Sequence, residues 1–77
     1  MPDIIKRGKA IFRDAYNFWE KHALRLNTER DEFWRVAAAD YETVWNLHAD
    51  DELMQAVLLA LYEDLERLWK EKNGEKN

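Results

Sequence analysis

The 77-residue sequence contains no cysteine and no serine, and it has one proline and two glycines. Without cysteine there is no disulfide framework and no thiolate metal site, which fits a protein of the reducing cytosol. Without serine or cysteine, a Ser–His or Cys–His nucleophilic pair cannot be built. A glycine-rich phosphate loop is also missing. We therefore expect neither an enzyme nor a protein with a cofactor.

Long hydrophobic runs are also absent. The longest uninterrupted apolar stretch runs from Ala56 to Tyr62, far short of the roughly 20 residues that a membrane-spanning helix needs. The first residues hold no apolar run of signal-peptide length. We therefore expect a soluble, cytoplasmic protein that does not bind membranes.

The charge balance is acidic, with a net charge of −4. Phosphate binding depends on clustered lysine and arginine, so we expect no nucleic-acid partner. A local exception is the basic group Lys6, Arg7, Lys9 and Arg13. These residues fall on the outer side of a predicted helix, mixed with Asp14 and Glu20. We interpret them as a solvated helix face, with nucleic-acid binding as the weaker hypothesis.

Apolar residues recur with the period of an α-helix in three segments, and no run alternates with period 2. The pattern predicts helices over residues 3–25, 29–47 and 51–72, with a frayed tail at 73–77. Asn27 is expected to end the first helix, while Thr28 and Asp50 are expected to be the N-caps of the next two.

Both predicted connections are short, so consecutive helices should lie antiparallel. The predicted fold is all-α: a single domain, residues 1–77, forming a three-helix up-down-up bundle. In the third helix a coiled-coil-like seam should pack inward, formed by Met54, Leu58, Leu61, Leu65 and Leu68. In the first helix, Phe12 and Trp19 lie mid-stripe and are expected in the core.

The apolar faces are wider than a small bundle needs. They span about 160°, 200° and 180° on the three helical wheels, against a requirement of somewhat over about 100°. The excess on the second and third helices favours association, so homodimerisation is one way to complete the bundle.

Aromatic residues lie at one edge of these wide faces. Trp34, Tyr41 and Trp45 share an edge of the second helix, and tryptophan and tyrosine are enriched at protein interfaces. Filling of a thin core remains the alternative role. We predict that these three residues contact a partner protein or a second copy, with Leu59 and Tyr62 as further candidates.

Four polar residues fall within or beside the apolar faces: His22, His48, Asp40 and Asp64. They suggest a metal- or ligand-binding bundle as an alternative function. The di-metal bundle signature requires Glu three residues before each histidine, and this sequence has Trp19 and Trp45 there. We therefore expect no metal. The leading hypothesis is a non-enzymatic protein–protein interaction module, such as a small bacterial adaptor or regulator.

Overall fold

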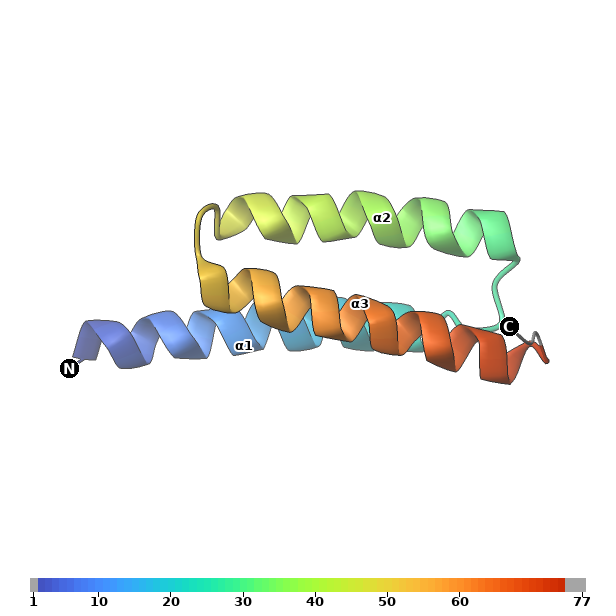
Figure 1. The fold of residues 1–77 in the computed structure, drawn as a ribbon, viewed down its shortest axis with the longest axis horizontal. Coiled ribbons are helices and arrows are strands. Elements are labelled where there is room, and N and C mark those ends of the chain that lie inside the picture. The colour runs from blue at the N-terminus through green and yellow to red at the C-terminus, as the bar shows by residue number, and fades with distance from the viewer. Residues whose placement is uncertain (1, 75–77) are drawn as a thin grey trace.

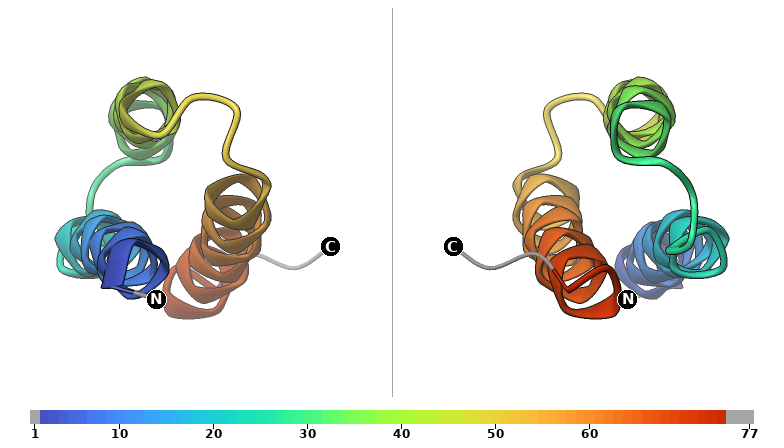
Figure 2. Two further views of the ribbon diagram at one scale, coloured as in Figure 1. Left: turned by 90° about the vertical axis from the view of Figure 1, so that its left-hand side faces the viewer. Right: turned by 90° about the vertical axis from the view of Figure 1, so that its right-hand side faces the viewer.

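The computed structural model describes residues 2–74, and in this range it contains three α-helices and no strand. They are α1 (Pro2–Ala23), α2 (Arg30–Leu47) and α3 (Glu52–Lys72). α1 and α3 run in one direction, and α2 runs antiparallel to both (Figure 1). Viewed end-on, the helices lie at the corners of a triangle (Figure 2). The predicted all-α, up-down-up bundle is confirmed.

The two connections are segments 24–29 and 48–51. α3 ends at Lys72, as predicted; Asn73 and Gly74 follow it, while the rest of the predicted frayed tail lies outside the described residues. None of the helices in the described chain combines the length and apolar character needed to cross a membrane.

The start of α2 differs from the sequence-based prediction. The N-cap is Glu29 rather than Thr28, and its carboxylate accepts hydrogen bonds from the backbone N–H groups of Asp31 (3.0 Å) and Glu32 (3.2 Å). Thr28 instead presents its carbonyl oxygen to Trp69 Nε1–H of α3 (3.2 Å). A tertiary contact thus replaces the local capping role that the sequence predicted.

The start of α3 is also one residue later than predicted. Asp51, not Asp50, is the N-cap, and its carboxylate accepts from Leu53 N–H (3.0 Å) and Met54 N–H (3.4 Å). Asp50 has a φ of 68°, in the left-handed region, where it turns the chain into α3. Asp50 therefore makes the turn, and the adjacent Asp51 caps the helix.

The core lies along the axis of the triangle. Its buried apolar residues come from all three helices: Ile11, Ala15 and Phe18 of α1, Phe33, Ala37 and Val44 of α2, and Met54, Leu58, Leu65 and Trp69 of α3. The predicted α3 seam is confirmed at Met54, Leu58 and Leu65, while Leu61 and Leu68 are partly buried at its edge.

α1 is where the prediction of the core was wrong. Phe12 is 54% exposed, and Trp19 is only partly buried, with its Nε1–H donating to Asp64 Oδ2 (3.0 Å). Trp19 therefore packs against the edge of the core beside α3, so the core prediction was wrong at Phe12 and partly confirmed at Trp19. A helical wheel gives the width of an apolar face, but it does not show where the neighbouring helices lie.

Gly8 lies inside α1, where glycine is a poor helix former. A Cβ added there meets no atom within 4 Å, and Gly8 is not among the residues with a positive φ. Gly8→Ala should therefore raise the free energy of unfolding by about 0.5–1 kcal/mol. Urea unfolding followed by circular dichroism measures this change.

Ala10→Gly, two residues further along the same helix, is the matched control. It should lower the free energy of unfolding by a similar amount. A Gly8→Ala protein that is less stable than the starting protein would contradict the open space found at this position.

Candidate functional site

The candidate site is a hollow between α2 and α3. It is lined by Ala38 and Tyr41 of α2 and by Leu59 and Tyr62 of α3, and we call it the α2–α3 groove. Three of these residues were predicted as contact residues from the sequence. Ala38 was not, although it lies one helical turn before Tyr41 and shares its face.

The predicted aromatic residues form one connected row along this groove. The Tyr41 ring meets the Tyr62 ring edge-on, with centroids 5.1 Å apart, and it stacks on Trp45 at 5.8 Å. On the other side, Trp34 lies 5.7 Å from Tyr62. These separations are typical of attractive aromatic pairs. The structure therefore brings together residues that the sequence places on two different helices.

These aromatic residues belong partly to the core and partly to the surface. Tyr41 also packs against Phe18 of α1 (6.1 Å), and Trp34 packs against the buried Phe33 (4.7 Å). Both rings remain partly exposed. Leu59 is 49% exposed, and Ala38 is exposed as well. The row thus forms a fixed apolar floor, and Leu59 forms its accessible rim.

The groove has acidic neighbours. Burial raises the pKa of the Tyr41 hydroxyl, and the negative charge of Glu63 raises it further. Burial likewise raises the pKa of the Tyr62 hydroxyl, with a further contribution from Glu66. Both phenols are therefore neutral at pH 7, and the charge beside them is carried by carboxylates.

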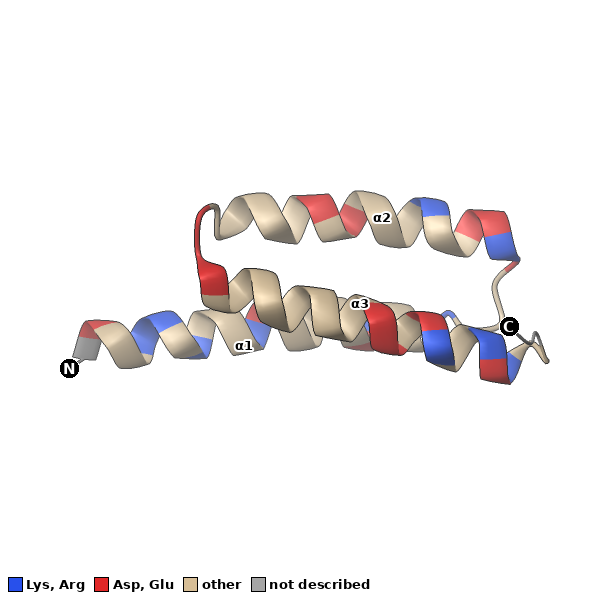
Figure 3. Cartoon of the chain, in the orientation of Figure 1, with Lys and Arg blue, Asp and Glu red and all other residues tan. Residues whose placement is uncertain are grey.

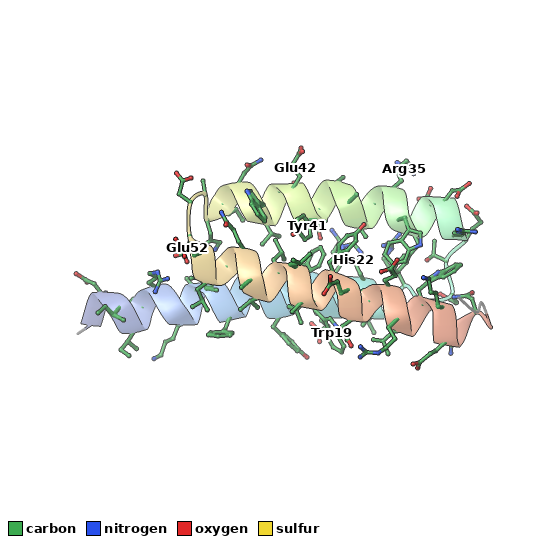
Figure 4. All side chains as sticks on the ribbon, viewed as in Figure 1. Trp19, His22, Arg35, Tyr41, Glu42 and Glu52 are labelled. Carbon is green, nitrogen blue, oxygen red and sulfur yellow. The ribbon has the colours of Figure 1, made fainter. Side chains whose placement is uncertain are left out.

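The outer face of α2 is polar. Glu42 and Arg35 point away from the bundle, whereas Tyr41 lies between α2 and α3 (Figure 4). The middle and final turns of α3 carry acidic residues together with basic ones (Figure 3). The groove is therefore an apolar strip with charged borders.

His22 is the polar residue that the fold buries most deeply, with no exposed side-chain surface. Its Nε2 lies 2.9 Å from Asp40 Oδ2, and its Nδ1 lies 2.7 Å from Arg25 NH1. A guanidinium can only donate, so Nδ1 must accept and Nε2–H must donate to Asp40. The two contacts therefore hold His22 as one neutral tautomer.

The surroundings of His22 disfavour its protonated form. Burial is the largest cause of its lowered pKa; the Asp40 carboxylate opposes this shift, and the positive charges of Arg25 and Lys21 add to it. The imidazole also packs edge-on against Phe18 (5.0 Å). This arrangement is a satisfied polar contact inside the core, closed to any substrate.

The four residues of the alternative metal hypothesis do not form one cluster. His22 pairs only with Asp40 among them (2.9 Å), whereas His48, the C-cap of α2, places its Nε2 2.7 Å from Asp14 Oδ2. Asp64 bonds Trp19 and forms an ion pair with Arg67. Within residues 2–74, no three His, Asp or Glu side chains gather into a group that could hold a metal ion.

Compared with known proteins, this chain matches no family model, no curated protein and no solved structure. The assignment of function therefore depends on the geometry of the bundle and its surfaces.

The neutral state of His22 predicts a pH-dependent stability. Because its pKa is lower in the folded than in the unfolded chain, where it is about 6.5, the unfolded chain takes up a proton that folded His22 does not. The contribution of neutral His22 to the free energy of unfolding is fully present above about pH 6.5 and is lost as the pH falls below that value. The urea midpoint should therefore be lower at pH 5 than at pH 7.5.

His22→Gln is the control for this pH effect, because an amide does not titrate in this range. The variant should be less stable at pH 7.5, and its urea midpoint should change less between pH 7.5 and 5. Three carboxyls also have a lowered pKa: Asp14, Glu29 and Asp51. Their contributions to the free energy of unfolding are lost mainly below about pH 4, outside the range from pH 5 to pH 7.5. An equal pH dependence in both proteins would assign the effect to other groups.

Proposed function

We propose that the protein is a non-enzymatic interaction module of the adaptor or regulator type. Its α2–α3 groove would bind a short amphipathic helix of a partner protein, one that carries basic residues beside its apolar face. The observation that carries this proposal is the groove itself, with the connected row of rings as its floor and Leu59 half exposed at its rim.

The shape of the groove supports a helical partner. The hollow spans one turn of each antiparallel helix, from Ala38 to Tyr41 and from Leu59 to Tyr62, and amphipathic helices bind in such hollows through apolar residues spaced three and four apart. Tyr41 and Tyr62 are already held by their contacts with Trp45 and Trp34. Little side-chain freedom would be lost on binding, which favours affinity.

The charges support a basic partner. Glu63 and Glu66 lie close enough to the groove tyrosines to raise their pKa values. A partner with lysine or arginine beside its apolar residues would meet these carboxylates, whereas an acidic helix would be repelled. Charge complementarity of this kind contributes mainly to specificity and to the rate of association.

The test uses a synthetic amphipathic peptide with leucines at helical spacing and lysines on both flanks. Titration into ¹⁵N-labelled protein should shift the backbone signals of Tyr41, Leu59 and Tyr62 in a saturable manner. The same peptide with glutamate in place of lysine should bind at least about tenfold more weakly. No saturable shift up to about 1 mM peptide, a weak limit of affinity, would overturn the proposal.

Leu59→Lys tests the location of binding. It places a charge on the apolar rim and should abolish the shifts, whereas Leu47→Lys should leave them unchanged. Leu47 is the matched control because it is an exposed leucine (67%) that borders α1 rather than the groove. Equal loss of binding in both variants would mean that the peptide responds to overall charge and not to the groove.

A further inference from the structure

A second apolar surface lies on α1. Most of the large apolar side chains that the described residues expose belong to this helix: Ile4 (59%), Ile5 (57%), Phe12 (54%) and Tyr16 (54%). Ile5, Phe12 and Tyr16 are seven and four residues apart, so they share one face of the helix. We call these three residues the α1 stripe.

The chain cannot cover the start of this stripe with its own helices. Arg7 pairs with Asp51, the N-cap of α3, at 2.7 Å. The residues before Arg7, including Ile4 and Ile5, therefore lie beyond the first turn of α3. Figure 1 shows this first part of α1 extending past the ends of both other helices.

The rest of the stripe is turned away from α2. Asp14 and Lys21 of α1 face α2, where they contact His48 and Asp40. Trp19, in contrast, contacts Asp64 of α3. The Tyr16 ring lies on the outer side of the Trp19 ring, with the two ring centroids 6.2 Å apart. Phe12 and Tyr16 therefore border the outer side of the α1–α3 pair, where they remain half exposed.

We propose that this stripe is a homodimer interface, in which the α1 helices of two copies pack antiparallel around a two-fold axis between Phe12 and Tyr16. Such an axis places Phe12 of each copy level with Tyr16 of the other. It also brings the overhanging Ile5 level with Ala23 of the other copy. The second copy thus supplies the apolar cover that one chain lacks.

The charges beside the stripe favour this arrangement. In the same register, Lys9 of one copy and Glu20 of the other lie at nearly the same height along the helix axis, offset by one residue or about 1.5 Å. The two-fold axis repeats this pair, so two attractive contacts form. A parallel dimer would instead place Lys9 beside Lys9 and bring Lys6 and Arg7 of the two copies together, whereas Arg13 lies near the level of its counterpart in either arrangement.

The available area predicts a weak dimer. The three half-exposed stripe residues offer on the order of 100 Å² each. About 300 Å² per copy is below the roughly 500–600 Å² per partner of specific, stable interfaces. We therefore expect a dissociation constant on the order of 10–100 µM.

Sedimentation equilibrium over a range of concentrations tests the proposal. The protein should shift from monomer to dimer, and Phe12→Lys should raise the dissociation constant at least about tenfold. Because Phe12 is exposed, this variant should keep its fold, which circular dichroism verifies. Leu47→Lys carries the same change on α2 and should dimerise normally. A chain that stays monomeric up to about 1 mM would overturn the proposal.

The groove variant separates this inference from the proposed function. Leu59→Lys should dimerise normally, because the α2–α3 groove is a different surface. If Leu59→Lys prevented dimerisation and Phe12→Lys did not, the groove rather than the α1 stripe would be the dimer interface, and the inference would be wrong.

A charge exchange tests the antiparallel register. At low ionic strength, where surface charges are least screened, Lys9→Glu and Glu20→Lys should each weaken the dimer about fivefold. The double variant, which restores opposite charges across the axis, should return the dissociation constant to within about twofold of the original. Failure of the double variant to recover would overturn the antiparallel pairing.

Discussion

A helix in a three-helix bundle has only two neighbours, and this geometric limit determines which apolar residues this chain can bury. Each helix turns one side toward the axis, where Ile11, Phe33 and Leu58 are fully enclosed. Apolar residues further around each helix lie at the edges, whatever their hydrophobicity. The half-exposed α1 stripe and the α2–α3 groove are both consequences of apolar faces wider than two neighbours can cover.

Polar contacts between helices determine their axial alignment, that is, which turn of one helix lies beside which turn of the next. Arg7 with Asp51 and Trp19 with Asp64 align α1 with α3, and His22 with Asp40 aligns α1 with α2. Apolar packing alone tolerates sliding, because one buried leucine resembles the next. These specific contacts also leave the start of α1 beyond α3, and therefore without cover.

The sequence predicts the number and order of the helices, and their limits to within two residues, because these depend on local periodicity and on breaks such as segment 24–29. It also identifies three of the four groove residues, Tyr41, Leu59 and Tyr62, since edge positions on a helical wheel border neighbouring helices. It does not predict the exposure of Phe12, because that depends on where α3 lies. Nor does it reveal that His22 of α1 pairs with Asp40 of α2, since contacts between helices have no local signal.

The two apolar surfaces are compatible with each other. The groove is bordered by α2 and α3, whereas the stripe lies on α1 and faces away from α2. A second copy on the stripe would leave the groove of each chain open. The dimer would then carry two grooves related by the two-fold axis. A partner with two suitably spaced helices would bind the second one intramolecularly, which raises its overall affinity without any new kind of contact. Weak dimerisation and modest groove affinity would in that case strengthen each other, because binding of such a partner also holds the two copies together.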